Sequence, residues 1–226
     1  PATAATGTNP NGVTVDPSGR FVYTENQADD TVTQLTIGGN GALTADRAVR
    51  TRDAPVAFAI TKGAAPVAFK SSFAYTTSYF QTDAGVNVSQ YTINATGGLV
   101  GAGTAPGTAS AARYVTANPS GTYVYVSNLL GQSIAQYSVG TTGALTPLTP
   151  TSVATDTGPI GHAIDPNGRF SYEVNYYANT VRAFSLAAGK LAANGAAVAT
   201  GSNPVCAALD PTGRFLYASN TDSSAT

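Results

Sequence analysis

The sequence predicts an all-β fold, a β-propeller of four-stranded antiparallel blades. The first observation is a repeat: PNGVTVDPSGRFVYTEN from Pro10 returns as PIGHAIDPNGRFSYEVN from Pro159 and as PVCAALDPTGRFLYASN from Pro204, with weaker copies from Pro55 and Ala112. The steps are 45, 57, 47 and 45 residues, and periods of about 40–50 residues are typical of propellers and related repeat folds. The second observation is that each repeat holds four short runs of strand character without helical periodicity.

The first repeat shows why each run is expected to be a strand. Alternating Val residues predict an inner strand over 12–16, and alternating aromatic and small residues predict a second strand over 21–25. Between them, Asp16-Pro17-Ser18-Gly19 predicts a tight turn, because Asp bonds the backbone ahead, Pro presets φ and Gly accepts a left-handed conformation. Asn26 closes the second strand, the run TVTQLTI predicts a third over 31–37, and a Gly-x-Leu turn at Gly41 leads to a fourth.

The later repeats carry the same signals in the same order. The third strand returns as NVSQYTI, SIAQYSV and TVRAFSL, and the Gly-x-Leu turn returns at Gly97, Gly143 and Gly189. The chain thus holds four full repeats and the first two strands of a fifth. We expect residues 1–226 to form a single propeller domain or a propeller fragment, five-bladed if it closes and otherwise part of a seven-bladed ring. Open blade edges would favour self-association.

Composition limits the classes of partner. Charged residues make up 10% of the chain and the net charge is -1, against roughly 25% charged residues in typical globular chains. This predicts no nucleic-acid partner and favours a secreted or cell-surface protein. No apolar run is long enough to predict a membrane span. The single cysteine, Cys206, cannot form an internal disulfide and is expected to be a buried small apolar residue.

The units DPSGRFVYTEN, NPSGTYVYVSN and DPTGRFLYASN, the first two followed by a Gly-x-Leu turn, resemble the YVTN-type repeats of lactonase-like β-propellers, a family that includes 6-phosphogluconolactonase-type proteins. The resemblance covers nearly the whole chain. It implies a propeller that usually closes with seven blades, and a lactone hydrolase with an Arg-His pair on one inner strand and an Asn-Glu pair after a second-strand Tyr. Fold alone does not determine function.

The mouth of the central channel is the expected ligand site. The positions that point to it are Asn11-Gly12, Val56-Ala57, Arg113-Tyr114, Ile160-Gly161 and Val205-Cys206. Arg113-Tyr114 is the one bulky polar pair among them and is the candidate to hold an anionic or carbohydrate group. The alternative for Arg113 is a structural ion pair within the blades.

The catalytic pattern implied by the resemblance is incomplete. Tyr114 stands where the His is expected, and Asn128 is followed by Leu129 rather than Glu. The single histidine, His162, comes one residue later than the pattern places it, so its side chain should point to the other face of the strand. We therefore expect His162 to be a hydrogen-bonded residue between blades, and the alternative role for His162 is ligand binding. No catalytic residue, metal site or cofactor is predicted.

Aromatic pairs in the loops between second and third strands complete the candidate set. Tyr176-Tyr177 and Tyr79-Phe80 lie in these loops and suit carbohydrate or peptide binding at one rim, or else they cap the blade edges. The function predicted on these grounds is a secreted or surface scaffold without catalytic activity that binds a protein, glycan or matrix partner. The alternatives are a lactone hydrolase resembling 6-phosphogluconolactonase and a self-assembling extracellular structural protein.

Overall fold

The computed structural model describes residues 4–16, 20–51, 53–62, 71–79, 88–107, 111–209 and 212–221, and these form strands and turns without a helix. The first blade is β1 (Pro10–Val15), β2 (Phe21–Asn26), β3 (Thr31–Ile37) and β4 (Leu43–Arg50). The second is β5 (Pro55–Lys62), β6 (Ser71–Ser78), β7 (Val88–Ile93) and β8 (Leu99–Thr104). The third is β9 (Ala112–Ala117), β10 (Tyr123–Asn128), β11 (Ser133–Val139) and β12 (Leu145–Ala154).

The fourth blade adds a short fifth strand, and the last repeat contributes two strands. The fourth blade is β13 (Pro159–Ile164), β14 (Phe170–Asn175), β15 (Thr180–Ala187) and β16 (Lys190–Ala193), with β17 (Val198–Ala199) also paired to β15. The last sheet is β18 (Pro204–Leu209) and β19 (Leu216–Asn220). The predicted all-β propeller architecture is confirmed: four repeats form four-stranded antiparallel blades and a partial fifth follows. Inner strands begin at Pro10 rather than residue 12, a small difference in boundary.

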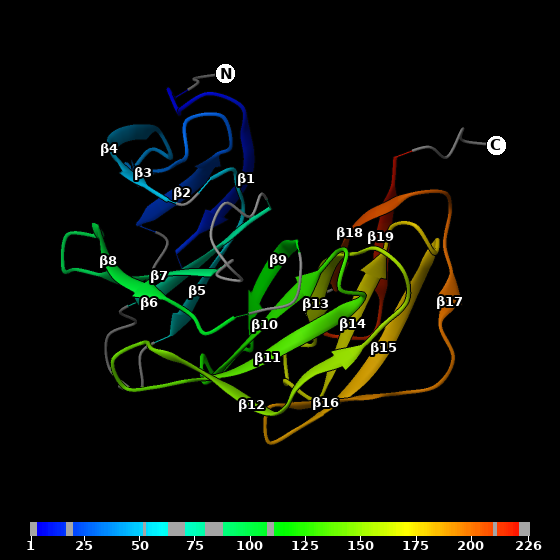
Figure 1. Ribbon diagram of the computed structural model, residues 1–226. Helices are drawn as coiled ribbons and strands as arrows, with labels where there is room; N and C mark the ends of the chain where they lie inside the picture. Colours follow the sequence, from blue (N-terminus) through cyan, green and yellow to red (C-terminus); the bar gives the residue numbers. More distant parts are fainter. Residues whose placement is uncertain are drawn as a thin grey trace.

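The blades stand side by side in an arc, with the first strand of each blade innermost (Figure 1). Successive inner strands contact one another in the order β1, β5, β9, β13 and β18. At the two ends of the arc, apolar side chains that would face another blade are exposed: Val13 is 68% exposed, whereas the matching Phe58 of the second blade is buried. The part of the chain that the structure describes contains no helix long and apolar enough to cross a membrane.

The aspartate that precedes the turn between inner and second strands bonds the backbone ahead of it, as predicted, in the first and fourth blades; residues 17–19 of the first turn lie outside the described residues. Oδ1 of Asp16 accepts hydrogen bonds from the backbone N–H groups of Arg20 and Phe21, both at 2.9 Å. Asp165 makes the same pair of bonds in the fourth blade. In the third blade Asn118 replaces Asp and its amide oxygen accepts the equivalent bonds. These acidic side chains therefore shape turns, as the repeat pattern predicts.

Each of the first three blades is tied to the next by a tyrosine. The hydroxyl groups of Tyr23, Tyr75 and Tyr125 donate to the carbonyl oxygens of Gly97, Gly143 and Gly189 at 2.8, 2.7 and 2.8 Å. These are the glycines of the Gly-x-Leu turns, and they adopt left-handed φ angles of 80, 85 and 78°. An aromatic ring of the preceding blade occupies the place of the missing Cβ at each turn, namely Phe21, Phe73 and Tyr123. We call these contacts the tyrosine ties.

Candidate functional site

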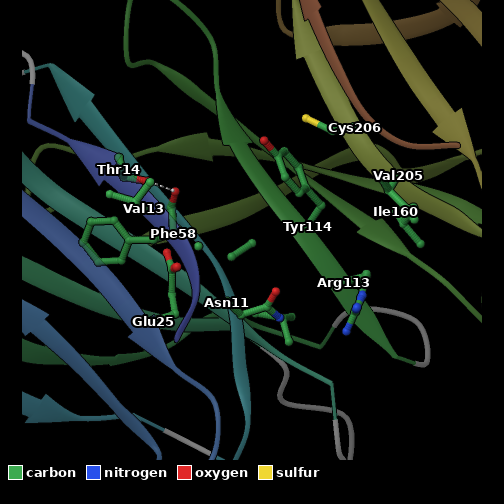
Figure 2. Close-up of a pocket in the computed structure, with 13 residues that line it drawn as sticks. Asn11, Val13, Thr14, Glu25, Phe58, Arg113, Tyr114, Ile160, Val205 and Cys206 are labelled. Carbon is green, nitrogen blue, oxygen red and sulfur yellow. Dashed lines mark hydrogen bonds between the residues drawn. The ribbon is translucent and has the colours of Figure 1, made fainter. Parts of the chain in front are cut away.

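The five inner strands surround a cavity of about 370 Å³, shown in Figure 2. The residue pairs expected at the channel mouth lie in its wall: four of the five pairs line it completely and the fifth lines it through Ile160. Thr14, Phe58, Val13 and Glu25 complete the wall. The cavity lies within the size range of small-molecule sites, about 300–1,000 Å³.

A β-bulge at the same point of every inner strand explains why two consecutive residues reach this cavity. The pairing of β1 with β2 passes from Pro10 to Gly12 and skips Asn11, and β9 likewise skips Arg113. The same shift occurs in β5, β13 and β18. A bulge places two residues opposite one partner and turns the side chain of the extra residue. Alternation alone would send one residue of each pair away from the channel.

Arg113 and Tyr114 both lie at the cavity, as predicted. The guanidinium carbon of Arg113 is 5.4 Å from the ring centroid of Tyr79, which is a cation–π contact, and among the described residues Arg113 does not form the ion pair considered from the sequence. Burial raises the pKa of Tyr114 to about 12, with smaller contributions from nearby Cys206 and Glu173. The phenol therefore stays protonated at working pH and can donate a hydrogen bond into the cavity.

Glu25 is a functional candidate that the sequence reasoning missed. Its side chain lines the cavity at the end of β2, is 1% exposed, and burial raises its pKa to about 7. Oε2 has no hydrogen-bond partner among the described residues. A Cβ at position 12 would overlap this oxygen, so the observed position of the carboxyl group depends on the glycine that lies opposite. A carboxyl poised near neutral pH at a ligand cavity has the properties of a general base.

The signal for Glu25 was present in the repeats. The matching positions of the other repeats carry uncharged residues: Thr77, Ser127, Val174 and Ser219. One carboxyl among four uncharged counterparts, paired with a glycine on the inner strand, marks a departure from the repeat pattern. Such departures identify candidate functional residues on a repeated scaffold.

His162 lies away from the cavity wall, between the third and fourth blades, as predicted. Its Nδ1 is 3.6 Å from Oε2 of Glu173, and the ring is 5.6 Å from that of Tyr125. The hydroxyl of Ser127 donates to the same carboxyl oxygen at 2.8 Å. The hydrogen bond expected for His162 is absent, because neither ring nitrogen has a partner among the described residues. Burial lowers the pKa of His162 to about 3 and raises that of Glu173.

Tyr176 and Tyr177 follow β14, and with Tyr79 and Leu129 they line a second hollow of about 360 Å³ beside the channel. Arg113, Ile160 and Val205 line both hollows. The structure therefore brings these two tyrosines and Arg113 together at one rim. Phe80, the neighbour of Tyr79, lies outside the described residues.

Cys206 differs from the prediction, because it is exposed rather than buried. It occupies the position of Gly12 and Gly161 in the first and fourth blades and lines the cavity opposite Glu25 (Figure 2). The expectation failed because an apolar run indicates strand character without saying which face is covered. Among the described residues, no group of three or more His, Cys, Asp or Glu side chains is placed to hold a metal ion.

Comparisons with known proteins agree with this architecture. Residues 87–226 match the family described as "Lactonase, 7-bladed beta-propeller". Similar solved structures include a Bacteroides uniformis protein provisionally assigned as a 6-phosphogluconolactonase, with a TM-score of 0.78, 19% identity, and coverage of 96% of this chain and 64% of that one. A periplasmic gluconolactonase from Pseudomonas aeruginosa has a TM-score of 0.75, 20% identity, and coverage of 94% and 65%. A search of curated proteins gives no match.

The chain spans about 64% of the length of these structures. The family match contradicts the prediction of a secreted scaffold without catalytic activity and supports the lactone hydrolase alternative instead. That prediction depended on finding no acid or base at the channel. The structure places the carboxyl group of Glu25, with a raised pKa, in the wall of this cavity.

Proposed function

Because this chain belongs to the lactonase family of seven-bladed β-propellers, we propose that the protein hydrolyses a lactone in the cavity between its inner strands. The observation that carries the proposal is the carboxyl group of Glu25, which lines this cavity with one oxygen unpartnered among the described residues and with a pKa raised to about 7. A general base works best when its pKa is near the operating pH. Glu25 meets that condition.

Glu25 acts on the water that attacks the lactone. The water oxygen bonds to the carbonyl carbon while its proton passes to the Glu25 carboxylate, giving a tetrahedral intermediate with a negative oxygen. The bond from that carbon to the ring oxygen then breaks, and the protonated Glu25 returns the proton to the leaving oxygen. One lactone and one water give one hydroxy acid.

Tyr114 and Arg113 supply the remaining chemistry of the cavity. The Tyr114 phenol, kept protonated by its raised pKa, donates a hydrogen bond to the oxygen that becomes negative in the intermediate. Arg113 binds a polar or anionic substituent and the carboxylate of the product. The solved relatives carry gluconolactonase and 6-phosphogluconolactonase names, so the substrate class proposed is a sugar δ-lactone.

The test is acid release measured in a pH-stat, with the uncatalysed hydrolysis of each lactone subtracted. We expect turnover of glucono-δ-lactone or its 6-phosphate, and a 10²- to 10⁴-fold loss of kcat in Glu25→Gln, on the order typical for a general base. Glu173→Gln is the matched control, because that carboxyl is equally buried but lies between blades. It should keep wild-type kcat.

The Arg113→Ala variant tests whether Arg113 distinguishes the phosphorylated lactone from the unphosphorylated one. If Arg113 holds a phosphate, this variant raises KM for the phosphorylated lactone far more than for the unphosphorylated one. Equal kinetics in Glu25→Gln and Glu173→Gln, or no acceleration of either lactone by the wild-type protein, would contradict the proposal.

A further inference from the structure

We propose that the hollow lined by Tyr79, Leu129, Tyr176 and Tyr177, here called the tyrosine pocket, is a subsite for a second sugar ring. The substrate is then the lactone of a disaccharide acid, with its lactone ring in the channel and its second ring among the tyrosines. This inference rests on the proposed function and specifies its substrate class.

The tyrosine pocket adjoins the channel cavity. Arg113 of β9, Ile160 of β13 and Val205 of β18 belong to the walls of both. Figure 2 shows these three side chains gathered on one side of the channel cavity. Because the two hollows share these walls, we place one ring of a two-ring ligand in each hollow, with Arg113 beside both. A single-ring lactone would leave this second volume of about 360 Å³ unused.

The two tyrosines of the fourth blade are held in place by the local chain. Their rings meet edge to face, with centroids 5.2 Å apart and an angle of 84° between the planes. The backbone N–H of Tyr176 donates to the carbonyl of Gly158 at 2.7 Å. A Cβ on Gly158 would lie 2.6 Å from Cδ2 of Tyr177, so the ring packs directly on the glycine. Tyr177 is 60% exposed but fixed, which is the arrangement of a preformed binding surface.

The chemistry of the tyrosine pocket fits a sugar ring. Its wall offers aromatic faces, phenol hydroxyls and one cation, Arg113, which is placed over the ring of Tyr79. Among its described lining residues there is no carboxyl group. A pyranose has an apolar C–H face and a rim of hydroxyl groups, and tyrosine pairs an apolar ring with a polar tip in the same way. A plain hydrocarbon would match the ring faces but leave the polar tips without partners.

The experiment compares two lactones in the same pH-stat assay. Wild-type kcat/KM should be higher for cellobiono-δ-lactone than for glucono-δ-lactone. Tyr176→Ala and Tyr177→Ala should each lower kcat/KM for the disaccharide lactone about tenfold, since an aromatic contact is worth about one factor of ten, and leave the monosaccharide lactone unchanged. Val198→Ala is the control, because it changes an exposed side chain of β17 in the same blade, outside both hollows.

Binding measurements separate failure of this inference from failure of the proposed function. Calorimetry with cellobionate and gluconate tests the subsite without turnover. Tighter binding of cellobionate that is lost in Tyr176→Ala supports the subsite even where no lactone is hydrolysed. Turnover of glucono-δ-lactone without a preference for the disaccharide, or equal binding of the two acids, overturns the subsite and leaves the proposed function standing. Dihydrocoumarin, an aryl lactone, tests the sugar assignment. If the tyrosine variants lower kcat/KM for dihydrocoumarin more than for the disaccharide lactone, the sugar assignment is overturned.

Discussion

Glu25 is buried in the wall of a cavity, and that position sets its acidity. Its pKa is raised to about 7 because burial removes water from the charged form. In the unfolded chain the carboxyl titrates near 4.5. Folding therefore favours the protonated form, so this contribution to stability is complete below pH 4.5 and is lost as the pH rises through 7.

The first prediction concerns this residue. Glu25→Gln removes the titration, so the free energy of unfolding of the variant relative to wild type should rise between pH 4.5 and pH 8.5, by up to about 3 kcal/mol at 1.36 kcal/mol per pKa unit. Urea unfolding at pH 4.5, 6.5 and 8.5 measures the difference. A difference that does not change with pH would show that the pKa of Glu25 is not raised by folding.

At the residue scale, sequence reasoning located the cavity but missed its carboxyl group. Equivalence among repeats was enough to place Arg113 and Tyr114 at the channel. Glu25 was missed because its role depends on the space left by Gly12 on the neighbouring strand. His162 was placed correctly between blades because a shift of one residue along a strand moves the side chain to the other face of the sheet. Its missing hydrogen bond depends on the 3.6 Å separation from Glu173, a distance that no sequence pattern specifies.

The tyrosine ties decide how the sheets are joined at the scale of the element. Position 189 favours glycine for two reasons. Its φ is +78°, and the ring of Tyr123 fills the place that a Cβ would occupy. Gly41 stands in the same type of turn with the same φ, but no atom of the described residues lies within 4 Å of its Cβ position. The two glycines therefore separate the cost of backbone strain from the cost of lost packing.

Gly41→Ala should cost about 1 kcal/mol of unfolding free energy, the strain of a left-handed alanine. Gly189→Ala should cost the same strain and about 1–3 kcal/mol more, because the Tyr123 ring must move. Denaturant titration of both variants, followed by far-ultraviolet circular dichroism, measures the difference. Equal losses would mean that the ring adapts freely and that the tie adds little to blade packing.

The sequence predicted the elements well and their lateral contacts poorly. The run TVTQLTI predicted β3 with its observed limits, because period-2 alternation and flanking Gly and Asn define a strand locally. The Gly-x-Leu turns were recognised from spacing. The bond from Tyr125 to Gly189 was not, since it joins residues 64 positions apart through the shape of two sheets. Sequence periodicity describes one blade and contains little about the contact between two.

For the whole molecule, the buried histidine and the buried carboxyl groups change stability with pH in opposite directions. Burial lowers the pKa of His162 from 6.5 to about 3, so its contribution to stability is lost as the pH falls below 6.5. Burial raises the pKa values of Glu25 and Glu173, so their contributions are lost as the pH rises above 4.5. Stability should therefore be greatest on the acid side of neutrality.

Thermal unfolding from pH 3 to pH 9 checks this expectation. The melting temperature should pass through a maximum between about pH 4.5 and 6.5 and fall on both sides. His162→Gln should flatten the acid limb, and Glu173→Gln the neutral and alkaline limb. A maximum above pH 8 would contradict the assignment of protonated carboxyl groups in the native blades.

Secretion, suggested by the low charge content, and self-association through blade edges stay predictions.

The tyrosine ties also have a direction that matters while the chain is being made. In each tie the donor tyrosine precedes its acceptor glycine, by 74, 68 and 64 residues. The ribosome makes the donor first, so the tie of a newly made blade can close only after the third strand of the next repeat and the turn that follows it have been made. Blades should then pack in sequence along the nascent chain, each one blade behind synthesis. A pause in translation within one repeat would leave the preceding blade without its tyrosine tie.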